Sequence, residues 1–78
     1  MAKTVQELIL EEKVEPGDIV RVMDIKTQSS ATGMACRDGT IICNSGDDFE
    51  SYLDREVDWY LDNRTWYNAR IFLLIFCK

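Results

Sequence analysis

Short apolar runs alternate with polar turns along the chain, and the spacing within each run predicts its secondary structure. Val5, Leu8 and Ile9 follow the i, i+3, i+4 spacing of one helix face. Thr4 lies just before this helix face, and Glu7 lies three residues after Thr4, which is the spacing of a capping box. The pattern predicts a helix of about nine residues near the start of the chain.

The next run, DIVRVMDI at residues 18–25, is rich in β-branched residues and apolar on both faces, which predicts an interior strand. Pro16 and Gly17 precede it in the order that a type II turn favours. Residues 26–33, KTQSSATG, are small and polar without a period, so we expect a loop there.

The segment MACRDGTIICN contains the strongest turn signal of the chain. Asp38-Gly39 lies between two apolar runs, which predicts a hairpin with a two-residue type I′ turn. In that register Cys36 lies opposite Ile41, and Ala35 lies opposite Ile42.

The segment NSGDDFESYLD, residues 44–54, predicts a turn followed by a second short helix. Ser45 or Asp47 can cap it, and the acidic residues that follow suit the positive end of a helix dipole. Phe49, Tyr52 and Leu53 have the spacing of a buried helix face.

The last third of the chain contains two segments with period-two patterns. In REVDWYLDN, alternation places Val57, Trp59 and Leu61 on one face and leaves an acidic row on the other, formed by Glu56, Asp58, Tyr60 and Asp62. The terminal strand, roughly residues 69–77, is apolar on both faces: one set is Ile71, Leu73 and Ile75, and the other is Phe72, Leu74 and Phe76.

These elements predict one α+β domain spanning residues 1–78, in the order α-β-β-β-α-β-β. Its sheet is expected to be mostly antiparallel, with four to five strands and two short helices. Two short helices cover only one face of such a sheet. One apolar set of the terminal strand is therefore uncovered, unless the loop 26–33 or the N-terminal segment folds over it.

An uncovered apolar patch indicates a contact surface, either for a protein partner or for a second copy of the chain. Trp66 and Tyr67 precede the terminal strand and are residue types that anchor interfaces. The candidate partner-binding residues are Glu56, Asp58, Tyr60, Asp62, Trp66 and Tyr67.

The net charge of −5 argues against direct nucleic-acid binding, which needs basic residues. Two interpretations of the acidic row stay open. The row can imitate a phosphate backbone and occupy a basic channel of a nucleic-acid-binding protein, or it can be an ordinary solvated face.

The chain lacks the residues that most catalytic and metal sites use. It has no histidine, and no phosphate-loop, dinucleotide or nucleophile-elbow motif. We therefore expect no enzyme activity, no catalytic residues, no cofactor and no metal.

Cys36, Cys43 and Cys77 match no zinc spacing and are expected to be reduced and buried. No apolar run is long enough to span a bilayer and no signal-peptide pattern opens the chain, so we expect a cytoplasmic protein without a membrane partner.

The segments TVQELI, DIVRVMD, GTIICNSGDDFESYLDREVDWYLDN and RIFLLIF occur here in a familiar order. This layout resembles small uncharacterised proteins carried by phages and mobile elements of Gram-positive bacteria, which often have a T-V-x-E-L helix and an L-D-R-E-V step, here Leu53 to Val57. The resemblance implies a bacterial host cell and a non-catalytic module that inhibits a host defence protein, such as a CRISPR nuclease, through its acidic and apolar face. The alternative is a structural or regulatory homodimer of a phage or mobile element.

Overall fold

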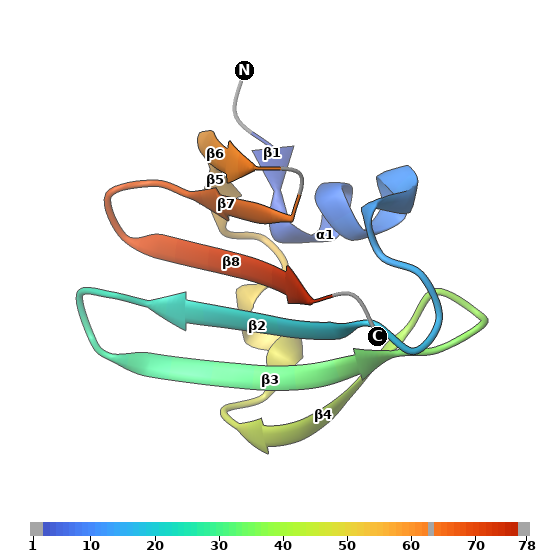
Figure 1. The fold of residues 1–78 in the computed structure, drawn as a ribbon. Helices are drawn as coiled ribbons and strands as arrows, with labels where there is room; N and C mark the ends of the chain where they lie inside the picture. The colour runs from blue at the N-terminus through green and yellow to red at the C-terminus, as the bar shows by residue number, and fades with distance from the viewer. Residues whose placement is uncertain (1–2, 63, 77–78) are drawn as a thin grey trace.

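The computed structural model describes residues 3–62 and 64–76, without the side chains of residues 12, 13 and 60–62. Its main layer is a six-stranded antiparallel sheet with the order β4-β3-β2-β8-β7-β6 (Figure 1). The strands are β2 (Ile19–Asp24), β3 (Ser29–Ala35), β4 (Ile41–Gly46), β6 (Trp59–Asp62), β7 (Thr65–Tyr67) and β8 (Ile71–Phe76). The predicted α+β class and the antiparallel sheet are confirmed, and β2 is the interior strand that its sequence predicts.

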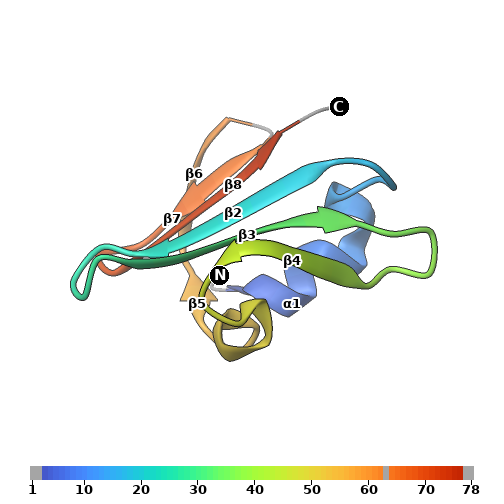
Figure 2. The same cartoon turned by 90° about the horizontal axis from the view of Figure 1, so that it is seen from below.

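All other described elements lie on one side of this sheet and form a helical layer (Figure 2). The layer consists of α1 (Val5–Leu8), the π-helical turn η1 (Ile9–Lys13), the 3-10 turn η2 (Phe49–Tyr52), and the paired strands β1 (Lys3–Thr4) and β5 (Glu56–Val57). The shortest dimension of the molecule is 19 Å, which accommodates two layers packed about 10 Å apart. The opposite face of the sheet is therefore uncovered by any described element.

The hydrophobic core lies between the sheet and the helical layer. Val20, Val22 and Leu73 of the central strands have no exposed surface. Val5 and Leu8 pack against them from α1, and Phe49 and Tyr52 do so from η2. The core-facing set of the terminal strand is thus Ile71, Leu73 and Ile75.

The first helix begins with the predicted capping box. The Thr4 hydroxyl accepts a hydrogen bond from the Glu7 N–H at 3.1 Å, and the Glu7 carboxylate accepts one from the Thr4 N–H at 3.4 Å. The helical path continues through η1 to Lys13, and the turn at Pro16 and Gly17 follows it. There the Asp18 N–H donates to the Glu15 carbonyl, and Gly17 adopts φ of +93°, as a type II turn requires.

The predicted second helix and the predicted order of elements are not confirmed. Residues 49–52 form only a 3-10 turn, capped by Asp48 rather than by Ser45 or Asp47, and Ser45 lies in β4. The carbonyls of Leu53 and Arg55, just beyond the turn, accept hydrogen bonds from the first N–H groups of α1. These bonds hold the chain close to α1, so η2 cannot extend into a longer helix.

The expected loop at residues 26–33 is wrong, because most of it belongs to β3. A tight turn at residues 25–28 joins β2 to β3, and the Asp24 carboxylate accepts hydrogen bonds from the N–H groups of Lys26 and Thr27. The small residues of β3 alternate regularly, with Ala31 and Ala35 facing the core. This segment therefore cannot fold over the second face of the sheet.

The hairpin around Asp38-Gly39 is confirmed, but its predicted register is wrong. Ala35 pairs with Ile41 rather than with Ile42, and the connecting loop is longer than two residues. A type I′ turn needs positive φ at both central residues, and here only Gly39 has it. Asp38 instead accepts hydrogen bonds from the N–H and the hydroxyl of Thr40, which stabilises the wider turn.

The predicted continuous strand over residues 56–62 is also wrong. It divides at Asp58 into β5, which pairs with β1, and β6, which lies at the edge of the main sheet. Val57 is buried with 3% exposed, whereas Trp59 is 52% exposed, so they do not share a face. Thr65–Tyr67 form the additional strand β7, and Asn68 closes the turn into β8 by accepting hydrogen bonds from the N–H groups of Arg70 and Ile71.

Gly33 allows β3 and β4 to approach closely at an irregularity in their pairing. A Cβ at this position would lie 2.4 Å from the Ile41 methyl carbon Cγ2 and 2.7 Å from the Ile42 carbonyl oxygen. We expect Gly33→Ala to lower the free energy of unfolding by about 1–3 kcal/mol, because the backbone of β4 must move. Urea denaturation measures this loss. Gly39→Ala is the contrasting variant, because no atom lies near the added Cβ and only the positive φ of this residue causes strain. If Gly33→Ala were as stable as the wild type, the close approach of β3 and β4 would be contradicted.

Candidate functional site

The uncovered side of the main sheet is the candidate functional site, and we call it the open face. Its outward positions follow from the strand register, in which Ile19, Arg21 and Met23 of β2 lie opposite Phe76, Leu74 and Phe72 of β8. The residues at these positions with described side chains are Ile19, Arg21, Met23, Ser30, Thr32, Met34, Ile42, Ser45, Trp59, Thr65, Tyr67, Phe72, Leu74 and Phe76. The set is mostly apolar, which is unusual for a sheet face that no described element covers.

A row of aromatic side chains crosses the strands at one end of the open face. Trp59 of β6 lies beside Tyr67 of β7, with ring centroids 5.8 Å apart. Tyr67 in turn lies 6.5 Å from Phe72 of β8. Both ring pairs are tilted and within the distance range of favourable aromatic contacts. The row therefore forms a preassembled aromatic surface next to the edge strand.

The other end of the open face carries three aliphatic side chains and one phenyl ring, and we call it the aliphatic end. Phe76, Ile19, Met34 and Ile42 follow one another across four strands. Ile42 is 58% exposed, Phe76 43% and Met34 41%. Apolar side chains that are this exposed and adjacent to one another indicate a contact surface rather than isolated surface residues.

Arg21 is the only charged residue among the open-face positions whose side chains are described; Asp62 of the edge strand β6 pairs with Thr65 of this face, and its side chain lies outside the described residues. Arg21 lies on the central strand β2, between Thr32 and Leu74 of the neighbouring strands. The exposed acidic residues of the described chain lie elsewhere, in the helical layer and in the loops: Glu7, Glu11, Glu15, Asp38, Asp47, Asp48, Glu50, Asp54, Glu56 and Asp58. The described part of the chain thus has an acidic helical layer and a mostly apolar sheet face with a positive charge at its centre.

The six residues predicted from the sequence do not form one surface. Glu56 is exposed on β5 within the helical layer, and Asp58 is exposed in the link to β6. Tyr60 and Asp62 belong to β6, but their side chains lie outside the described residues. The alternation expected to align these four residues does not run through Asp58.

The two aromatic candidates face opposite sides of β7. Trp66 is 8% exposed and belongs to the core cluster, so little of it is accessible to a partner. Tyr67 is half-buried on the open face, where it contacts the rings of Trp59 and Phe72.

Sequence reasoning missed Arg21, Met34 and Ile42 as parts of a shared surface. The apolar positions on one side of β2 and of the terminal strand were visible as patterns, but nothing in the sequence paired those two segments. The pairing of β2 with β8 joins residues more than forty positions apart and creates the face.

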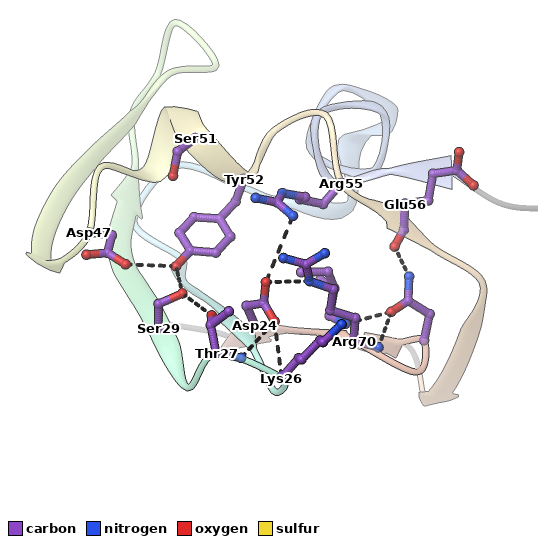
Figure 3. A network of polar contacts seen from close by, with 12 residues as sticks. Asp24, Lys26, Thr27, Ser29, Asp47, Ser51, Tyr52, Arg55, Glu56 and Arg70 are labelled. Carbon is purple, nitrogen blue, oxygen red and sulfur yellow. Dashed lines mark hydrogen bonds and ion pairs between the residues drawn. The ribbon is translucent and has the colours of Figure 1, made fainter.

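Buried polar groups cluster on the other side of the sheet, beneath η2 (Figure 3). The Asp24 carboxylate is nearly inaccessible and accepts a hydrogen bond from Arg70 Nε at 2.6 Å, with Arg55 Nη1 3.9 Å away. Burial by itself would raise the pKa of Asp24, but the hydrogen bonds from Arg70, Thr27 and Lys26 outweigh it and lower the pKa. A carboxylate held ionised in this way is a structural ion pair rather than a poised acid or base.

The Tyr52 hydroxyl completes this network. It lies 2.8 Å from the Ser29 hydroxyl and 3.1 Å from the Asp47 carboxylate (Figure 3). Burial raises the pKa of Tyr52, and the nearby Asp47 raises it further. Within the described part of the chain, no buried side-chain nitrogen or oxygen lacks a hydrogen-bond partner, so these bonds account for the whole cluster.

A pocket of about 390 Å³ opens between η1, η2 and the hairpin of β3 and β4. Ile9, Ile41, Phe49 and Leu53 supply its apolar walls, and Cys43 also lines it. Cys43 is exposed, contrary to the expectation of buried cysteines, because the helical layer does not reach across the edge strand β4. Cys36 is half-buried and free, and Cys77 lies outside the described residues.

The described residues contain no group of three or more metal-ligating side chains arranged around a common point. None of the helices in this part of the chain is long and apolar enough to cross a membrane. No protein family, no curated protein and no solved structure matches the chain.

Proposed function

We propose that this protein is a non-catalytic protein-binding module that engages its partner through the open face. The proposal rests on the side chains of the terminal strand β8 that lie on the open face. Phe72 and Leu74 are half-buried and Phe76 is exposed, with no described element covering them. Leaving these side chains in water costs free energy that a partner recovers by covering them.

The size and composition of the open face support the proposal. Six strands about 4.8 Å apart, with lengths of about 10 to 23 Å for three to seven residues, have a projected area of roughly 500 Å². Specific interfaces bury about 800 Å² on each partner, and transient ones bury less. Trp59, Tyr67 and Phe72 supply the aromatic types that dominate interface energies, and Met34 can adapt to a partner's shape.

Inhibition of a host defence protein, which the resemblance implies, stays a prediction within this proposal. The described part of the acidic row is reduced to Glu56 and Asp58, which are exposed but do not share a continuous strand. The contact surface that we propose is therefore the apolar open face, and the acidic helical layer is left as a solvated surface.

Selection from a phage-displayed library of random peptides tests the proposed function. We expect the immobilised protein to enrich peptides that Trp59→Ser and Phe76→Ser bind at least about tenfold more weakly, since both side chains are exposed on the open face. Leu10→Ser is the matched control, because Leu10 is 67% exposed on η1, away from the open face. Peptides that lose binding to Leu10→Ser but not to the other two variants would overturn the proposal.

A further inference from the structure

From the positive charge at the centre of the open face, we infer that the partner is a protein segment that presents a carboxylate flanked by apolar side chains, and that Arg21 binds this carboxylate. The inference rests on the proposed function and specifies the chemistry of the partner. Arg21 lies on β2 near the centre of the face, with Ile19 and Met23 two residues away on the same side of the strand.

Covering the centre of the open face removes the Arg21 guanidinium from water. No hydrogen bond or ion pair joins Arg21 to another described side chain, and its exposed side chain projects from the open face. Burying an unpaired charge is costly, whereas a paired and hydrogen-bonded one is tolerated. A partner that covers the surrounding apolar residues must therefore supply an acceptor to Arg21.

A carboxylate is the acceptor that fits this position best. The planar guanidinium offers parallel N–H groups that bind both oxygens of a carboxylate. The neighbours of Arg21 across the strands, Thr32 and Leu74, carry no charge, so no residue adjacent to Arg21 on the face competes for the guanidinium or repels an acid. Apolar residues on either side of the acid would then meet the aromatic row and the aliphatic end.

A second copy of this chain fits the open face poorly. Two open faces packed together would bury two Arg21 side chains, whose neighbours in the cross-strand row, Thr32, Leu74 and Thr65, carry no charge; the acidic position in this row is Asp62, at the edge strand β6. The face also provides roughly 1,000 Å² in total between two copies, whereas obligate homodimers bury about 2,000–5,000 Å². The small area favours a different, acidic partner over an obligate homodimer.

The peptide selection tests this inference when it is repeated with variants of Arg21. We expect peptides enriched by the wild type to contain Asp or Glu between apolar residues, and those enriched by Arg21→Glu to contain Lys or Arg instead. Arg21→Gln should bind the wild-type peptides roughly tenfold to hundredfold more weakly, since a charge-assisted hydrogen bond is lost. Arg37→Glu, in the exposed hairpin turn, is the matched control and should retain the preference for acidic peptides.

The outcomes separate the inference from the proposed function. Peptides that depend on Trp59 and Phe76 but show no acidic enrichment would overturn the inference and leave the proposed function standing. Peptides that do not depend on the open face would overturn both. Light scattering measures whether the free protein is a monomer or a dimer. A dimer that Trp59→Ser dissociates would identify a second copy as the occupant of the open face and would overturn the inference of an acidic partner.

Discussion

Leu73→Ala is expected to lower the free energy of unfolding by about 2–5 kcal/mol. Leu73 has no exposed surface and lies on the core side of β8, where truncation leaves a cavity between the sheet and the helical layer. A domain of this size typically has only about 3–5 kcal/mol of stability from its core. A large fraction of the variant should therefore be unfolded at 25 °C, which circular dichroism and urea denaturation measure.

Leu74→Ala is the matched control for this prediction. It removes the same atoms from the next residue of the same strand, but on the open face, where Leu74 is half-buried. We expect a loss of about 1 kcal/mol or less, because little packing is lost and solvent fills the space. Equal losses for the two variants would mean that both sides of β8 are covered, which contradicts the two-layer arrangement.

Asp24→Asn is expected to cause the second large effect and to remove much of the acid sensitivity of the fold. The carboxylate is buried, accepts hydrogen bonds from two backbone N–H groups, and pairs with Arg70 and Arg55. An asparagine keeps the shape but loses the charge, so that the two arginines lose their common partner. We expect a clear drop in the urea midpoint at neutral pH, larger than the drop for Asp38→Asn in the exposed hairpin turn.

The pH dependence follows from the lowered pKa of Asp24. The pKa is below its ordinary value in the folded state, so ionised Asp24 stabilises the fold above about pH 4. This stabilisation is lost as the pH falls through the folded-state pKa. The wild type should therefore lose stability as the pH falls below about 4, and Asp24→Asn should lose less over the same acid range. Asp38→Asn is the control, because hydrogen bonds from Thr40 also lower the pKa of Asp38, but on an exposed turn. If wild type and Asp24→Asn lost the same stability in acid, the role of the buried ion pair would be contradicted.

Local patterns in the sequence predicted several elements correctly. The capping box of Thr4 and Glu7, the turn at Pro16 and Gly17, and the buried side of Phe49 and Tyr52 depend on neighbouring residues, so spacing alone reveals them. The interior position of β2 followed from its two apolar sides.

The errors arose where tertiary contacts override local pattern. The small polar residues of β3 resemble a loop, yet they form a strand because β2 and β4 pair with it on both sides. The alternation of residues 56–62 predicts one strand, but β5 leaves the main sheet to pair with β1 in the helical layer. This division moves Trp59 to the open face and separates the acidic row.

The candidate site was only partly predictable for the same reason. The sequence showed that one apolar set of the terminal strand lacked cover, but both sets were equally apolar and neither could be chosen. The choice depends on the side from which α1 and η2 pack, which is a property of the whole fold. The central position of Arg21 likewise depends on the pairing of β2 with β8.

The central claim, that the open face binds the partner, is tested most directly by mapping a bound peptide onto the structure. Backbone amide chemical shifts of the labelled protein would be followed by NMR during titration with the tightest-binding selected peptide. We predict that the largest changes occur at Trp59, Tyr67, Phe72 and Leu74 and at their neighbours on β2, while α1 and η2 change little. Changes concentrated on α1, η2 and the acidic residues of the helical layer, with the open face unaffected, would contradict the account.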